Sequence, residues 1–172
     1  MNSAELLHLQ FEVMLRQFGG TLHGLSLERL YRRARAGGNS ISFTLWHVLR
    51  TWDAYHATVQ HEPGLYDDEW AARFGFDVSG RGIEGSGMGT GFTPRDVALV
   101  KARPKMLKAY RDALWAQTEA FLHATSDRAL GRAVTIPWWP QPVPVARVYA
   151  HVVMHSLLHI GEANYLKGRL RR

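Results

Sequence analysis

The chain has 172 residues, of which 46% are hydrophobic and 21% are charged, so we expect a single globular domain over residues 1–172 with a sizeable core. Its formal net charge is +6, but the basic residues are spread out and accompany no nucleic-acid-binding motif, which argues against a nucleic-acid partner. The absence of cysteine excludes disulfides, thiolate metal sites and a cysteine nucleophile. Residues 1–18 do not resemble a signal peptide and no segment has the apolar length of a membrane span, so we expect a cytoplasmic protein that is not in a membrane.

The first third of the chain predicts two main helices. Ser3 can cap the first, whose apolar residues at helical spacing are Leu6, Leu9, Val13 and Phe18, and Gly19 and Gly20 end or interrupt it. Residues 27–36 form either a short helix or a continuation. Asn39 and Ser40 can cap the next helix, residues 41–60, in which one apolar stripe consists of Phe43, Trp46, Leu49 and Trp52.

The pattern breaks over residues 61–92, where we expect one short helix around Glu69 and then a long glycine-rich loop. Six glycines occur in the thirteen residues 79–91. A loop of this length is usually functional or mobile, so it is either a lid over a site or a tolerated surface insertion. Residues 80–85, GRGIEG, match a dinucleotide-binding pattern, but no strand precedes them and no helix follows directly, so we do not expect a nucleotide site.

Thr93, Pro94 and Asp96 mark the start of a third helix that should run to about Ala124, with Pro104 kinking or restarting it. A linker with four prolines then holds Trp138 and Trp139 in an extended segment. The fourth helix is expected from about residue 143 to residue 170, and no β-strand pattern is visible. The predicted fold is therefore all-α: a four-helix bundle with a long glycine-rich loop between its second and third helices.

Three histidines, His151, His155 and His159, recur at intervals of four in the last helix. Residues at i and i+4 lie about 6 Å apart on one helix face, whereas i and i+8 are about 12 Å apart along the axis. One metal ion can therefore take either neighbouring pair, and a third ligand must come from another helix. His47, within the second helix, is the best candidate, and His56 is its rival.

The other histidines have the character of surface residues; these are His8, His23, His61 and His123. An alternative for His47 and its partners is a set of hydrogen-bonded core histidines without a metal. A metal is favoured because each buried imidazole without a partner would cost about 1–3 kcal/mol, and one ion satisfies all of them.

Two distant motifs resemble the DinB-like (DinB/YfiT-type) family of four-helix-bundle metalloproteins. The last helix resembles its H-x3-H-x3-H-x-G-[QE] pattern with His151, His155, His159, Gly161 and Glu162. The second helix resembles its S-x3-T-L-W-H-x2-R-x2-D pattern with Ser40, Thr44, Leu45, Trp46, His47, Arg50 and Asp53. The stretch from Trp70 to Gly75 and the loop after it also resemble one branch, so the resemblance covers residues 5–170. Ile160 departs from the arginine that is usual there.

The resemblance implies a divalent metal, with Zn, Ni or Fe as candidates, held by His47, His155 and His159. His151, Glu162 and Asp53 would lie beside the ligands without binding the metal. Three imidazoles leave coordination positions open for water or a substrate atom. The characterised proteins that this chain resembles are thiol-dependent S-transferases, which use a low-molecular-weight thiol cosubstrate, or look like metal-dependent hydrolases. Relatives are often homodimers, so the resemblance also implies a homodimer.

We therefore expect a metal-dependent transferase or hydrolase with a small-molecule substrate. The alternative is a non-catalytic binding or stress-related bundle whose metal is structural or incidental. That alternative predicts a small, filled cavity at the three histidines, whereas an enzyme needs a pocket that can hold a cosubstrate.

Overall fold

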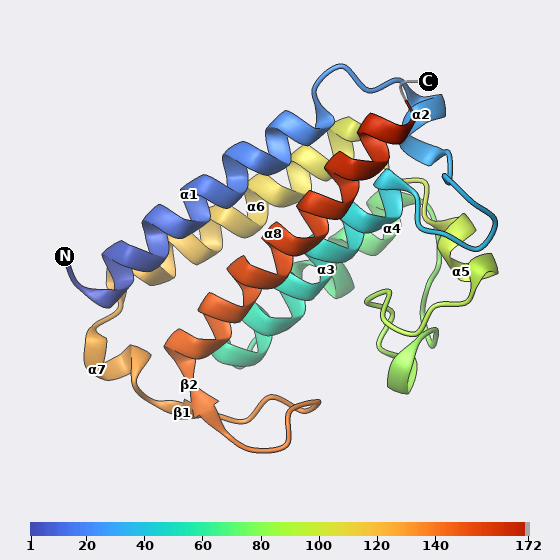
Figure 1. Cartoon of the computed structure of the whole chain (residues 1–172). Coiled ribbons are helices and arrows are strands. Elements are labelled where there is room, and N and C mark those ends of the chain that lie inside the picture. The colour runs from blue at the N-terminus through green and yellow to red at the C-terminus, as the bar shows by residue number, and fades with distance from the viewer. Residues whose placement is uncertain (171–172) are drawn as a thin grey trace.

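Four long helices form the body of the computed structural model, which describes residues 1–170 without the side chains of Asp67 and Asp68. They are α1 (Ser3–Leu22), α3 (Ile41–Gln60), α6 (Pro104–Ala124) and α8 (Val145–Arg169). Helices α1 and α3 each pack against both α6 and α8, so α1 lies diagonally across the bundle from α3 (Figure 1). The predicted four-helix bundle is confirmed. Within the described residues, no helix is long and apolar enough to cross a membrane.

The connections contain shorter elements. These are α2 (Leu27–Tyr31), the π-helical turn η1 (Tyr66–Trp70), α4 (Ala71–Phe74), the 3₁₀ turn η2 (Ile83–Gly85), α5 (Pro94–Leu99) and α7 (Asp127–Leu130). The short helix expected around Glu69 is thus present as η1 and α4. The expectation of no strand was wrong: β1 (Ala133–Val134) pairs antiparallel with β2 (Val143–Pro144). This pairing occupies residues 143–144, so α8 begins two residues later than predicted.

Side-chain caps and a proline set where the main helices begin. The Ser40 hydroxyl accepts from the backbone N–H of Phe43, as predicted for the start of α3. At the start of α1 the cap is Asn2, one residue before the predicted Ser3. Pro104 begins a new helix and does not kink one long helix, because α5 ends at Leu99 and α6 begins with Pro104. At the first position of a helix the missing N–H of proline costs no hydrogen bond.

Helix α1 buries a different face from the one predicted. Of the four predicted apolar residues, Phe18 is buried, but Leu6, Leu9 and Val13 are 45%, 50% and 41% exposed, and the core receives Ala4, Leu7, Phe11 and Met14 in their place. Both sets have helical spacing and both include Phe18, but only the buried set also contains Phe11, a second aromatic residue of the core. The helix also continues through Gly19 and Gly20 to Leu22, where the Lys167 ammonium donates to the carbonyls of Gly20, Thr21 and His23.

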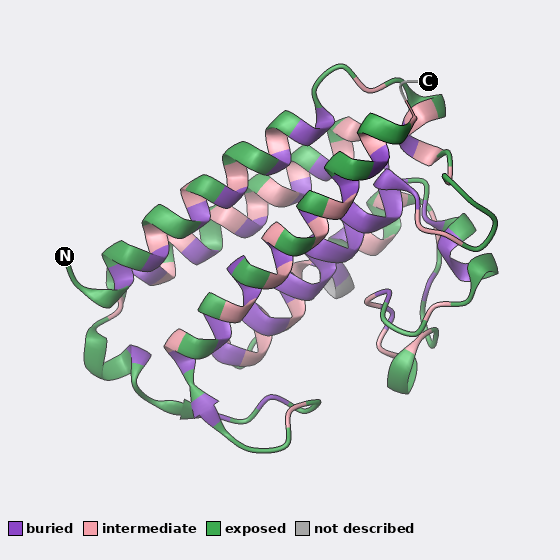
Figure 2. Cartoon of the chain, viewed as in Figure 1, coloured by how far each residue is buried: buried purple, intermediate pink, exposed green. Residues whose placement is uncertain are grey.

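Helix α3 is the most enclosed helix, with buried residues on nearly all sides (Figure 2). Its buried Asp53 accepts hydrogen bonds from the backbone N–H groups of Leu65 and Tyr66 at 2.9 and 2.8 Å, and from the Tyr110 hydroxyl at 2.6 Å. Arg50 donates to the same carboxylate at 3.2 Å. Asp53 therefore ties the segment after α3 to α6 and sets the path into the glycine-rich loop.

Candidate metal centre

His47 of α3 meets His155 and His159 of α8 where the two helices pack together. The ring centroid of His47 lies 5.1 Å from that of His155 and 5.0 Å from that of His159, and the latter two are 4.5 Å apart. One nitrogen of each ring can be chosen so that all three lie within 4.8 Å of one another. Nitrogens bound to one tetrahedral zinc at about 2.0–2.1 Å would be roughly 3.4 Å apart, so small side-chain movements suffice to close the set.

The glycine-rich loop orients His47. The Nδ1 atom of His47 donates to the backbone carbonyl of Met88 at 2.6 Å; a carbonyl only accepts, so the proton is on Nδ1 and Nε2 keeps its lone pair for a metal. The next residue, Gly89, has φ +107°, and a Cβ there would lie 2.9 Å from His47 Nδ1. The loop backbone therefore presses directly on the imidazole. The loop is therefore part of the site and is not merely a surface insertion.

Glu162 orients His159 in the same way. Its carboxylate accepts from His159 Nδ1 at 3.0 Å and from the Asn39 side-chain amide at 3.3 Å. The hydrogen bond from His159 lowers the pKa of Glu162, which keeps it ionised at neutral pH. Nε2 of His159 is then free to bind a metal. A carbonyl or carboxylate partner on the second nitrogen is the usual support of a metal-binding histidine.

His155 lacks such support. Its Nδ1 is buried and has no hydrogen-bond partner among the described residues. Burial, together with the neighbouring His47 and His159, lowers the pKa of His155 to about 3, and burial also lowers the pKa of His47. Both rings are therefore neutral at pH 7, which is the state that binds a metal. The unpartnered nitrogen and the neutral rings fit a divalent ion of the kind that prefers imidazole.

The remaining predicted residues lie apart from this set. The ring of His151 is 5.9 Å from that of His155, one helical turn away, and contributes no nitrogen to the cluster. Asp53 instead accepts hydrogen bonds from the segment after α3 and from Tyr110. The rival ligand His56 is 2.8 Å from the Tyr149 hydroxyl, elsewhere in the core.

A second group of potential ligands, His8, Glu119 and His123, also brings its ligand atoms within 4.8 Å of one another. His8 Nε2 lies 3.2 Å from a Glu119 carboxylate oxygen, so these two groups satisfy each other without a metal. His123 is exposed. From the sequence, both histidines are predicted to be surface residues. The i, i+4 spacing of Glu119 and His123 was the available signal, but only the packing of α1 on α6 brings His8 to them.

A cavity of about 510 Å³ opens beside the three-histidine cluster. Its lining includes His155, His151, Tyr55, Trp138, Thr51 and, from the glycine-rich loop, Glu84, Ser86 and Met88. The Ser86 hydroxyl is buried and has no partner within the described part of the chain. The indole N–H groups of Trp138 and Trp139 both donate to the Tyr55 hydroxyl, at 2.8 and 2.9 Å. The tryptophan pair is therefore fixed at the site, one member as a cavity wall.

Comparison with known proteins agrees with this architecture. The structure of a conserved protein from Enterococcus faecalis aligns with a TM-score of 0.83 at 19% identity, over 98% of this chain and 97% of that one. A DinB-like protein from Bacillus cereus aligns with a TM-score of 0.64 at 15% identity, over 94% and 89%. At these identities the likeness establishes the fold. No curated protein sequence matches. The profile of the DinB superfamily matches residues 10–163, which is most of the chain, and the protein therefore belongs to the DinB superfamily.

Proposed function

We propose that the protein is a divalent-metal-dependent enzyme acting on a small molecule, either a thiol-dependent S-transferase or a hydrolase. The observation that carries the proposal is the meeting of His47, His155 and His159, of which His155 also lines a cavity. A divalent metal bound by these three would supply Lewis-acid activation of a substrate atom at its open positions. The candidate metals remain Zn, Ni and Fe, because imidazole suits each of them.

The cavity favours an enzyme over a non-catalytic bundle. Its volume of about 510 Å³ lies within the range of small-molecule sites, roughly 300–1,000 Å³, whereas a structural metal would predict a filled site. The walls combine the apolar rings of Tyr55 and Trp138 with a few polar groups, which is the usual composition of a ligand pocket.

The protein groups at the cavity have identifiable tasks. Met88 and Glu162 hold the rings of His47 and His159, so the ligand nitrogens are oriented before any substrate arrives. The Ser86 hydroxyl, which has no partner among the described residues, is available for a hydrogen bond to a substrate. The loop that carries Met88 and Ser86 covers the cluster, which favours its function as a lid that limits the access of water.

Metal analysis of the purified protein tests the proposal. We expect about one equivalent of a divalent transition metal in the wild type, and its loss in the His47→Ala and His159→Ala variants. The His8→Ala/His123→Ala double variant is the matched control and should keep the metal. Stoichiometric metal that survives both single substitutions, or that disappears only in the double variant, would overturn the proposal.

We also propose that the protein is a homodimer, as the family resemblance implies. The exposed apolar residues of α1 and α8 support this: Leu6, Leu9, Val13, Met154 and Leu158. Val13, Met154 and Leu158 line one common hollow, so the two helices offer a continuous apolar surface. Sedimentation velocity should give the mass of a dimer for the wild type and of a monomer for Leu158→Asp, and a monomeric wild type would exclude this assembly.

A further inference from the structure

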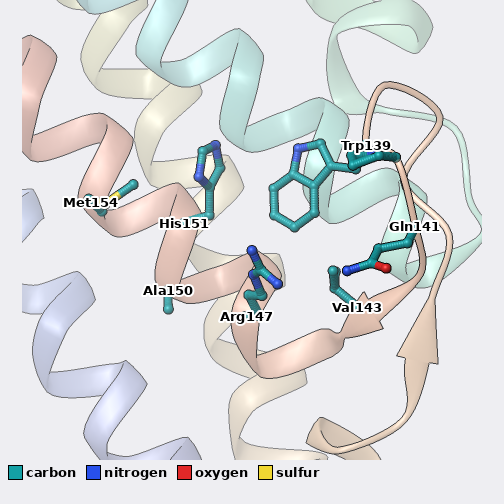
Figure 3. A pocket seen from close by; sticks show the side chains of 8 residues that line it. Trp139, Gln141, Val143, Arg147, Ala150, His151 and Met154 are labelled. Atoms are coloured by element: carbon teal, nitrogen blue, oxygen red, sulfur yellow. The ribbon is translucent and has the colours of Figure 1, made fainter.

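A second hollow, also of about 510 Å³, lies along the first turns of α8, next to the cavity at the candidate metal centre. Its lining includes Trp139, Gln141, Val143, Arg147, His151 and Met154 (Figure 3). His151 lines both this hollow and the cavity that contains His155. The two spaces therefore meet at the side chain of His151, and together they are called the groove below.

The groove follows one face of α8. Arg147, His151, His155 and His159 recur at intervals of four residues, so their side chains follow one another along the helix at steps of about 6 Å. Arg147 is thus about 12 Å along the axis from His155. In Figure 3 its guanidinium points toward His151 and Trp139.

The rings that form the wall of the groove where its two parts meet are held in place. Both indole N–H groups, of Trp138 and Trp139, are already bound to the Tyr55 hydroxyl. The ring of Trp139 meets that of His151 edge-on, with centroids 5.1 Å apart and planes at 88°. Because the indole donors are occupied, this wall offers apolar ring surface to a ligand and leaves polar recognition to other groups.

Those other groups are Arg147 and Gln141. The Arg147 guanidinium carbon lies 5.7 Å from the centroid of the Trp139 ring, and the Gln141 side chain faces the same space (Figure 3). Of the residues that line this hollow within the described chain, none is acidic. The single acidic side chain in the adjoining cavity lining is Glu84. A positive charge without an acidic neighbour in its hollow, beside an amide donor, suits a planar anion.

We propose that this hollow binds the carboxylate end of an elongated substrate whose other end reaches the three-histidine centre. Arg147 and Gln141 bind the carboxylate, and Trp139 packs against the middle of the molecule. The span from the carboxylate to the reacting atom is then about one to two helical turns, roughly 6–12 Å. This inference rests on the proposed function and names the class of substrate for it: a small carboxylic acid with its reacting group at the far end.

Binding of bifunctional probes to the Co(II)-loaded protein tests the inference. The probes are linear ω-mercaptocarboxylic acids of increasing length and the ω-mercaptoalcohols of matching length, followed by the thiolate-to-cobalt absorption band. We expect the acids to bind about fivefold to tenfold more tightly than the alcohols, only at lengths that span the groove. Arg147→Gln should abolish this preference and leave the alcohols unchanged, which also shows that the variant is folded.

The matched control is Arg128→Gln, which removes the same charge from an exposed position on α7 and should keep the preference for acids. Equal binding of acids and alcohols by the wild type, or an unchanged preference in Arg147→Gln, would overturn the inference while leaving the metal centre in place. A wild type that binds no Co(II) at all would instead overturn the proposed function, and the inference with it.

Discussion

The backbone carbonyl of Met88 accepts a 2.6 Å hydrogen bond from Nδ1 of His47, across 41 positions of sequence. This contact connects the glycine-rich loop to a candidate metal ligand. It fixes the tautomer of His47 and also fixes the loop, so the two parts of the site depend on each other.

Substitution of Gly89 should weaken metal binding through this contact. In Gly89→Ala the new methyl group would lie 2.9 Å from His47 Nδ1, on backbone at φ +107°. We expect the affinity for Zn(II) to fall about tenfold to a hundredfold, as when a metal-binding histidine loses its supporting hydrogen bond. Competition with a chromophoric chelator measures this. Gly80→Ala is the matched control: its φ is +68°, but nothing lies within 4 Å of its Cβ position. Equal losses in both variants would show that general loop strain is the cause.

Glu162 should contribute to the metal affinity through His159. Glu162→Ala removes the acceptor of the 3.0 Å hydrogen bond and should lower the Zn(II) affinity about tenfold or more. Glu162→Gln keeps an acceptor oxygen without the charge, so its affinity should lie between those of the wild type and the alanine variant. The same chelator competition measures both variants. An affinity that is unchanged in Glu162→Ala would mean that His159 needs no orientation by this carboxylate.

The sequence predicted the histidine cluster better than its surroundings. Helix geometry restricted the α8 ligands to a neighbouring pair, and the position of His47 within the second helix made it the best third candidate. The family resemblance then selected His155 and His159 as the pair, and the structure brings these three residues together. The hydrogen bond to the Met88 carbonyl could not be predicted. Every residue has a backbone carbonyl, and the position of this one depends on the loop conformation. The face of α1 could not be predicted from spacing alone, since Leu6, Leu9 and Val13 repeat as regularly as Leu7, Phe11 and Met14. Which of two such stripes is buried depends on the helices that pack against α1.

Asp53 should contribute to the stability of the fold. Its buried carboxylate accepts from Leu65, Tyr66, Tyr110 and Arg50. Asp53→Ala removes this shared acceptor from the core and should lower the free energy of unfolding by roughly 3–5 kcal/mol, measured by urea denaturation. Asp112→Ala, at a carboxylate 63% exposed, should change it by less than about 0.5 kcal/mol. A variant as stable as the wild type that has lost its metal would instead place Asp53 among the groups that support the ligands.

His56 should make the protein less stable in mild acid. Burial lowers its pKa from 6.5 to about 4, so between these values the unfolded chain takes up a proton that the folded chain does not. Stability is therefore complete above about pH 6.5 and falls as the pH decreases toward 4, by up to roughly 3 kcal/mol from this residue. The lowered pKa of His155 also reduces stability in acid, so the experiment must separate the contribution of His56.

Urea denaturation of the metal-free wild type and of His56→Gln, at about pH 7 and about pH 4.5, makes that comparison. The glutamine can still form a hydrogen bond with the Tyr149 hydroxyl, now 2.8 Å from His56 Nδ1. We expect the variant to lose less stability than the wild type between the two pH values. Equal losses would mean that His56 is not the group that takes up the proton on unfolding.

A crystal structure of the metal-loaded protein, with the metal identified by anomalous scattering, tests the central claim most directly. We expect one strong anomalous peak, at about 2.1 Å from one nitrogen each of His47, His155 and His159, with the open coordination positions of the metal toward the cavity. A peak found only among His8, Glu119 and His123, or a fourth protein ligand that closes the site, would contradict it.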